Sequence, residues 1–172
     1  MSFSPYIIEA PYYAPDQALR EEFNDDKPLV LVAEDHEDTR FMIRTMLEMI
    51  GCQVLEATTG SSAIEVARRA QPGLILIDGN MPLLDGLSAA RLMRGYSELA
   101  DVPIVALSGH AKPEFHAAAL AAGCDDCFVK PIEYEQIKNL ISGLFHKFPD
   151  AARNSTGTRN HRYADAATHI TR

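Results

Sequence analysis

Short apolar runs alternate with longer amphipathic stretches between residues 28 and 148. Runs such as Leu29–Ala33 and Leu74–Ile77 are nearly continuous in aliphatic residues, which is typical of strands buried on both faces of a parallel sheet. The stretches between the runs have the length and apolar spacing of helices. A strand followed by a helix, repeated five times, predicts an α/β fold with a five-stranded parallel sheet and helices on both faces.

The predicted strands and helices are read directly from this alternation. The strands are Leu29–Ala33, Gln53–Ala57, Leu74–Ile77, Ile104–Leu107 and Asp126–Val129, and the helices are Asp38–Ile50, Ser61–Ala70, Gly86–Tyr96, Pro113–Ala122 and Tyr134–Phe145. Gly51 and Gly123 stand where helix C-termini favour a positive φ. Met42, Met46 and Met49 recur at helical spacing, so we expect one core-facing stripe rather than metal or haem ligands.

Composition narrows the class of protein. The chain has 172 residues and 47% apolar content, enough for one domain with a core. A net charge of −8 argues against nucleic acid or an anionic membrane as the main partner. Apolar runs of about five residues are far shorter than a membrane span. The first residues show no export signal, and three cysteines give no disulfide framework, so we expect a cytoplasmic protein.

The two ends differ in composition from the segment between them. Residues 1–27 contain three prolines and an acidic run, which predicts an N-terminal extension with one short helix in "DQALREEF". Residues 28–148 form the predicted domain. Residues 149–172 show no apolar periodicity and predict a flexible polar tail.

Candidate functional residues come directly after four of the five predicted strands, whereas the acid-free "TTGSS" follows the second. Glu34 and Asp35 follow the first strand, Asp78 the third, Ser108 the fourth and Lys130 the fifth. The carboxyl ends of parallel strands share one edge of the sheet, where ligands bind in open α/β folds. Three carboxylates, a hydroxyl and an ammonium group are therefore expected to converge there.

This group of residues suits phosphoryl chemistry assisted by Mg²⁺. Clustered carboxylates repel one another unless a hard cation such as Mg²⁺ neutralises them, with Asp35 and Asp78 as direct ligands. The turn after Asp78 leaves the main-chain carbonyl of Asn80 free to join the metal site. A carboxylate beside Mg²⁺ can attack a phosphoryl group and form an acyl phosphate. Ser108 and Lys130 are suited to hold the phosphoryl oxygens.

Four motifs at these strand ends resemble the receiver domain of two-component response regulators. They are "LVLVAEDHEDTR", "LILIDGNMPLLDG", "IVALSGH" and "DDCFVKP", in that order over about 120 residues. The resemblance implies a doubly wound, flavodoxin-like sheet with strand order 2-1-3-4-5, as in the chemotaxis regulator. It also implies a role for each site residue: Asp78 as phosphoacceptor, Glu34 and Asp35 as the acidic pair, the Asn80 carbonyl as metal ligand, Ser108 as switch hydroxyl, Lys130 as phosphate partner, and a cis Lys130–Pro131 bond.

Other conspicuous residues have ordinary explanations. Asp85 reads as a turn or N-cap residue before the next helix. Cys124 and Cys127 form a CxxC spacing, but without a second pair we expect neither a zinc nor a redox site. His36 and His110 are expected at the rim of the site as exposed bystanders.

The resulting hypothesis is a stand-alone receiver. It would take a phosphoryl group from a histidine kinase or phosphotransfer protein and signal by contact with an unknown protein, with no catalysis beyond its own phosphorylation and dephosphorylation. The 24 residues after Phe148 are too few for an output domain. Two alternatives remain: a degenerate receiver that binds partners without phosphate, and an aspartyl-nucleophile phosphatase. The phosphatase is disfavoured because Asn80 stands where its acid–base Asp would be. The sequence contains no P-loop, which argues against a nucleotide-dependent enzyme.

One position departs from the receiver pattern. Receivers usually carry Tyr or Phe three residues before the lysine, whereas this chain has Cys127. Phe128 points to the other face of the strand because side chains alternate. We therefore expect a phosphorylation signal to pass through the backbone of the loop from Ser108 to Pro113 rather than through rotation of a ring.

Overall fold

A five-stranded parallel sheet forms the centre of the molecule in the computed structural model, which describes residues 23–146. The strands are β1 (Leu29–Ala33), β2 (Gln53–Ala57), β3 (Leu74–Asp78), β4 (Ile104–Ser108) and β5 (Asp126–Val129). Their order is β2-β1-β3-β4-β5, and every neighbouring pair is parallel. The predicted fold class and strand order are confirmed.

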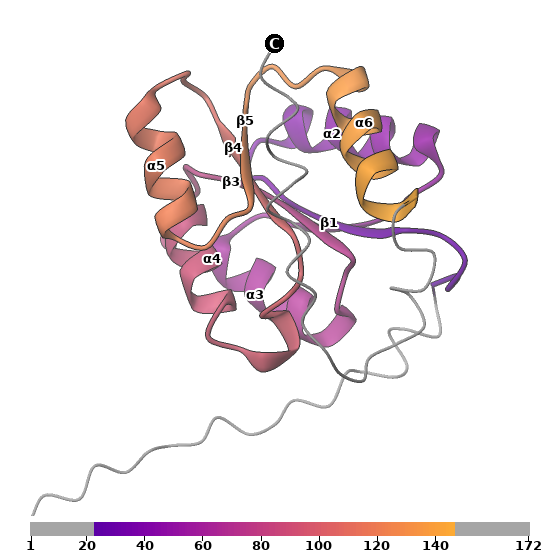
Figure 1. The fold of residues 1–172 in the computed structure, drawn as a ribbon, viewed down its shortest axis with the longest axis horizontal. Helices are drawn as coiled ribbons and strands as arrows, with labels where there is room; N and C mark the ends of the chain where they lie inside the picture. The colour runs from indigo at the N-terminus through magenta and orange to yellow at the C-terminus, as the bar shows by residue number, and fades with distance from the viewer. Residues whose placement is uncertain (1–22, 147–172) are drawn as a thin grey trace, which may run out of the picture.

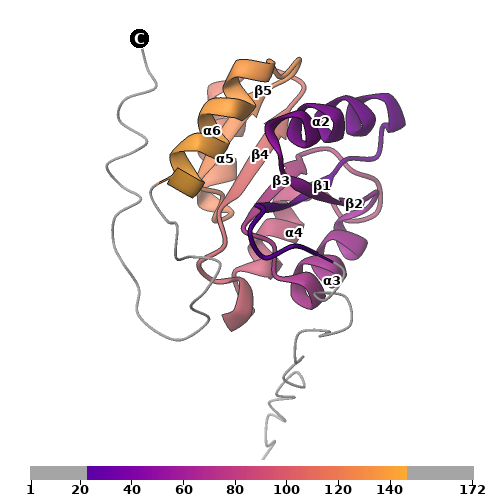
Figure 2. The ribbon, with the colours of Figure 1, turned by 90° about the vertical axis from the view of Figure 1, so that its right-hand side faces the viewer.

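Helices cover both faces of this sheet. They are α2 (Glu37–Ile50), α3 (Gly60–Ala70), α4 (Gly86–Met93), α5 (Pro113–Ala121) and α6 (Tyr134–His146), with a short 3-10 helix, η1 (Ser97–Leu99). Helices α2 and α6 lie on one face, and α3, α4 and α5 on the other (Figures 1 and 2). None of the helices in residues 23–146 combines the length and apolarity needed to span a bilayer.

Two apolar layers hold the helices to the sheet. Side chains alternate along each strand, so β1 sends Leu31 to one layer and Val30 and Val32 to the other. The layer under α3, α4 and α5 contains many alanines, which let these helices approach closely, whereas Ile43 and Ile137 fill the layer under α2 and α6. All residues of β3 and β4 are buried. The central strand β3 and its neighbour β4 therefore provide a rigid base for the loops at their carboxyl ends.

Local signals in the sequence explain where the helices begin and end. Gly51 ends α2 at φ 101°, and its N–H bonds the carbonyls of Leu47 and Glu48. Gly123 also has a positive φ, of 93°. A capping box formed by Thr59 and Ser62 starts α3. The predicted roles of both glycines are confirmed.

Helix α4 ends three residues earlier than predicted, at Met93 instead of Tyr96. The N–H groups of Gly95 and Tyr96 bond carbonyls three residues back rather than four, so the chain tightens out of the α-helix. The Arg94 guanidinium fixes this exit by donating to the carbonyls of Leu99 and Val102.

The expected methionine stripe is wrong at its last member. Met42 and Met46 are partly buried, but Met49 is 70% exposed. The buried side of α2 is centred on Ile43 and Leu47, and at 3.6 residues per turn Met49 lies about 140° from that centre.

The terminal predictions fall mostly outside the described residues. The helix expected in "DQALREEF" and the tail at 149–172 lie outside residues 23–146, as does most of the 1–27 extension. Within its described part, Asn24 bonds the side chain of Gln53 in both directions, which joins this segment to the first residue of β2.

Candidate functional site

Asp78 is the last residue of β3, and it ends the central run that the sequence analysis singled out. It is 3% exposed, and its Oδ1 accepts a hydrogen bond of 3.3 Å from the Asn80 N–H. A side chain at Gly86 would overlap the Asp78 carbonyl oxygen, so the chain after the strand returns close against the Asp78 backbone. The carboxylate is thus held by strand and turn together.

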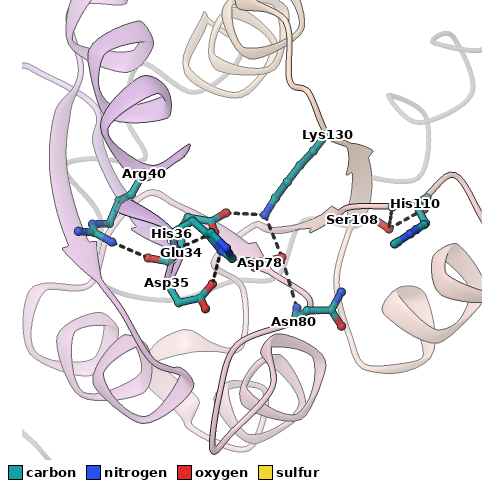
Figure 3. Close-up of polar contacts among 9 residues, drawn as sticks. All are labelled: Glu34, Asp35, His36, Arg40, Asp78, Asn80, Ser108, His110 and Lys130. Carbon is teal, nitrogen blue, oxygen red and sulfur yellow. Dashed lines mark hydrogen bonds and ion pairs between the residues drawn. The ribbon is translucent and has the colours of Figure 1, made fainter. Parts of the chain in front are cut away.

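Lys130 joins Asp78 to the first strand. Its Nζ lies 2.5 Å from Oε2 of Glu34 and 3.1 Å from Oδ1 of Asp78 (Figure 3). The Glu34 side chain is fully buried and that of Lys130 is 21% exposed. Burial alone would lower the pKa of Lys130, but the Glu34 hydrogen bond and the Asp78 charge outweigh it, so this pKa is raised above its ordinary value. Lys130 is therefore a cation shared by two buried carboxylates.

Both carboxylate oxygens of Glu34 and its main-chain carbonyl accept hydrogen bonds. Its Oε1 accepts from the His36 N–H at 3.2 Å, and its main-chain carbonyl accepts from Arg40 at 2.9 Å. The neighbouring Asp35 is more open, with a side chain that is 27% exposed and lies 3.2 Å from Nδ1 of His36. The acidic pair therefore has one buried member and one that reaches solvent.

The donor set at this edge suits a hard divalent cation. Carboxylate oxygens come from Glu34, Asp35 and Asp78, and the loop after Asp78 brings the main chain of Asn80 beside them (Figure 3). Both contacts that the described residues make with the Asp78 carboxylate use Oδ1. Oδ2 therefore remains for a cation or a phosphoryl group, and the residues present fit a Mg²⁺ site.

Ser108 ends β4 and is 2% exposed, but its hydroxyl is turned into its own loop. Oγ donates to the His110 carbonyl at 2.6 Å and accepts from the His110 N–H at 3.1 Å. Figure 3 shows the Ser108–His110 pair on the far side of Lys130 from the acidic pair. The structure thus brings Glu34, Asp78 and Lys130 into contact, while the Ser108 hydroxyl is engaged with its own loop instead.

Sequence reasoning missed Phe115, an aromatic residue of α5 beside the site. A side chain at Gly79, next to Asp78, would overlap the Phe115 ring. The same ring lines a surface pocket of about 230 Å³ together with Cys127, Val129 and the loop residues His110 and Lys112. The sequence alone would predict that a single Phe in an alanine-rich helix belongs to the apolar core. Its place beside the site is seen only in the packing of α5 in the folded structure.

The residues given ordinary explanations are also placed by the structure. Asp85 is the N-cap of α4 and accepts from the Ser88 N–H and hydroxyl, which lowers the pKa of Asp85. Cys124 and Cys127 are free thiols. His36 is exposed at the rim, as expected, but its ring contacts Asp35. The Lys130–Pro131 peptide bond is cis.

Comparison with known proteins identifies the family of the domain that carries these residues. Residues 30–142 match the response regulator receiver domain. The transcriptional regulatory protein PrrA of Mycobacterium tuberculosis is 32% identical over 131 residues, which cover 76% of this chain and 55% of PrrA. The chain thus spans about half the length of this relative.

Two solved structures show the same fold. The receiver domain of the sensor histidine kinase PA1611 from Pseudomonas aeruginosa, solved with a magnesium ion in its active-site cleft, is 29% identical, with a TM-score of 0.66 over 70% of this chain and 98% of that one. The chemotaxis protein CheY4 of Vibrio cholerae is 27% identical, with a TM-score of 0.65 over 69% of this chain and 98% of that one.

Proposed function

The chain belongs to the response regulator receiver domain family of two-component signalling, and we propose that it accepts a phosphoryl group on Asp78 in a Mg²⁺-dependent reaction. The donor is a histidine kinase or a histidine phosphotransfer protein, and the output is contact with another protein. Its chemistry is confined to the phosphorylation and dephosphorylation of this one carboxylate.

The observation that carries this proposal is the Glu34–Lys130–Asp78 cluster. A carboxylate at a rigid strand end, 3.1 Å from a shared ammonium group and beside two further acids, is costly for a structural role alone. The same arrangement suits phosphoryl transfer, in which catalysis consists mainly of positioning and electrostatic stabilisation. The magnesium ion in the related PA1611 receiver supports the choice of cation.

Each residue has a defined part in the transfer. Oδ2 of Asp78 attacks phosphorus and forms the new O–P bond while the bond to the donor's imidazole nitrogen breaks. Lys130 lies within reach of the same carboxylate and can move its ammonium group from Glu34 or Asp78 to a phosphoryl oxygen. Glu34, Asp35, Asp78 and the Asn80 carbonyl are the groups that would hold Mg²⁺. When bound, that ion offsets the repulsion between the carboxylates and the phosphoryl oxygens.

Ser108 links the transfer to the surface. Its hydroxyl proton is engaged with the His110 carbonyl, so donation to a phosphoryl oxygen breaks that bond. The loop that contains His110 then loses the two bonds to Ser108 that hold it in its present position, and its backbone groups take other partners. Phosphorylation is therefore coupled to the backbone between Ser108 and Pro113.

Intact mass spectrometry tests the proposal directly. The full chain is incubated with a small acyl-phosphate donor, with MgCl₂ or with a chelator. We expect one phosphoryl group on the wild type with Mg²⁺, and none on Asp78→Asn. Asp85→Asn is the matched control, because Asp85 lies in the same loop but caps α4, and it should label like the wild type. Equal labelling of Asp78→Asn and wild type would overturn the assignment.

A further inference from the structure

His36 lies against the acidic pair in a way that the ordinary role of an exposed histidine does not require. Its Nδ1 is 3.2 Å from Oδ1 of Asp35 and 3.6 Å from Oε1 of Glu34. One ligand atom from each of the three residues lies within 4.8 Å of the others. Figure 3 shows the ring beside both carboxylates. The side chain is 77% exposed, so the edge of the ring away from Nδ1 is open to solvent.

These separations match those of ligands around a single ion. Two ligands about 2.1 Å from an ion are about 3.0 Å apart at an octahedral angle and about 3.4 Å apart at a tetrahedral angle. The 3.2 Å between His36 and Asp35 falls between these values, and the 3.6 Å to Glu34 lies just above them. The oxygens of Glu34 and Asp35 in this group lie within 4.8 Å of each other, so a side-chain rotation at the more open Asp35 would bring all three groups onto one cation.

The main chain of His36 is anchored beside the acidic pair. The His36 N–H donates to Oε1 of Glu34, whose other oxygen is held by Lys130. His36 then precedes α2 with an extended backbone, φ −77° and ψ 117°, and makes no side-chain cap bond to that helix. The side-chain hydrogen bond that His36 makes within the described residues is to Asp35, so the imidazole is committed neither to the helix nor to the core, and a cation shared with Asp35 would replace the proton of that bond.

We propose that His36 is a metal ligand that makes the cation site of this receiver prefer a borderline transition ion, represented by Zn²⁺, over Mg²⁺. Carboxylate ligands alone suit Mg²⁺. An imidazole nitrogen suits Zn²⁺, Cu²⁺ and Ni²⁺ and adds little to the affinity for Mg²⁺. The inference rests on the proposed function, because both place a cation at Asp35. It assigns the metal selectivity of the site to one side chain.

Calorimetric titration of the metal-free full chain with ZnCl₂ and with MgCl₂, at one fixed neutral pH, tests this assignment. We expect His36→Ala to weaken Zn²⁺ binding at least about tenfold and to change Mg²⁺ binding less than about twofold. His110→Ala is the matched control, since His110 is also exposed but bonds Ser108 through its backbone, and it should bind both ions like the wild type. Asp35→Ala should lose both ions.

Ring-nitrogen NMR separates this site from any other that takes Zn²⁺. The His36 ring signals, identified by their absence in His36→Ala, should shift with Zn²⁺ and return when excess Mg²⁺ displaces it. Unshifted His36 signals, unchanged Zn²⁺ affinity in His36→Ala, or an equal loss of Mg²⁺ affinity would each overturn the inference.

The two proposals fail separately. Mg²⁺-dependent labelling of Asp78 without a Zn²⁺ effect of His36→Ala sinks the metal inference and leaves the proposed function in place. Zn²⁺ binding through His36 in a chain whose Asp78 never labels does the reverse.

Discussion

Removing the charge of Lys130 should destabilise the fold far more than removing an ordinary surface lysine. Lys130→Met keeps most of the side-chain volume but leaves Glu34, which is fully buried, without its cation 2.5 Å away. Breaking a buried ion pair from one side costs about 3–5 kcal/mol. Because Lys130 is 21% exposed and Asp35 opens the site to water, we expect the lower end, about 3 kcal/mol.

Charge, rather than packing, should account for this loss. In the double variant Glu34→Gln/Lys130→Met, the buried charge of Glu34 is gone while Asp78 keeps its own, and the glutamine carbonyl can still accept from the His36 N–H that Oε1 accepts now. We therefore expect the double variant to be more stable than the sum of the two single changes predicts, by about 1–2 kcal/mol.

Urea unfolding followed by circular dichroism, with a chelator present, measures these free energies. Lys138→Met is the control, because Lys138 lies 3.5 Å from Glu135 with both side chains at least half exposed, and such pairs contribute about 0.5 kcal/mol or less. If Lys130→Met and Lys138→Met lose the same stability, or if the double variant is additive, the ion pair does not hold Glu34 in its buried, charged state.

Three further changes test other parts of the structure. Gly86→Ala should lower the free energy of unfolding in urea by at least about 2 kcal/mol and slow the labelling of Asp78, because the new methyl group overlaps the Asp78 carbonyl. Gly109→Ala is the control, because the space around its Cβ is open, and it should change the free energy of unfolding little. Burial raises the pKa of Cys52 to about 11. Because the thiol then loses its proton more easily in the unfolded chain, the free energy of unfolding falls as the pH rises toward that value. Between about pH 9 and 10.5 the wild type should therefore lose about 1–2 kcal/mol more of this free energy than Cys52→Ala. Finally, Cys127→Ala should leave phosphorylation-dependent hydrogen exchange of the Ser108–Pro113 loop nearly unchanged, whereas Gly109→Pro should impair it; uncoupling by Cys127→Ala alone would place the thiol in the switch.

The sheet could be predicted because its determinants are local and one-dimensional. Strands β1, β2 and β5 have the predicted bounds, and β3 and β4 each extend by one residue, to Asp78 and Ser108. Both added residues are polar, so an apolar-run criterion stops before them. The pairing continues through them because the parallel ladder depends on the backbone, with Asp78 opposite Leu107 and Ser108 opposite Val129.

The site could be predicted as a set of residues but not as a set of bonds. Strand order places Asp78 and Lys130 at one edge whatever their rotamers, so their proximity follows from topology. Topology does not decide that Lys130 divides its charge between Glu34 and Asp78, or that His36 turns toward Asp35. Those choices depend on side-chain torsions and competing partners, for which a sequence carries no periodic signal.

If the proposed function holds, the loop after β4 offers a route for coupling that needs no ring at position 127. At rest, both the carbonyl and the N–H of His110 are satisfied by the Ser108 hydroxyl, so moving that hydroxyl toward Asp78 leaves backbone polar groups to be satisfied elsewhere. Beside Cys127, a pocket of about 230 Å³ borders this loop and gives it room to move. Phe115 lines the same pocket and packs over Gly79, the residue after Asp78. A displacement of the chain at Asp78 on phosphorylation would therefore meet an aromatic ring directly, from α5 rather than from β5, and that ring and the loop line one pocket.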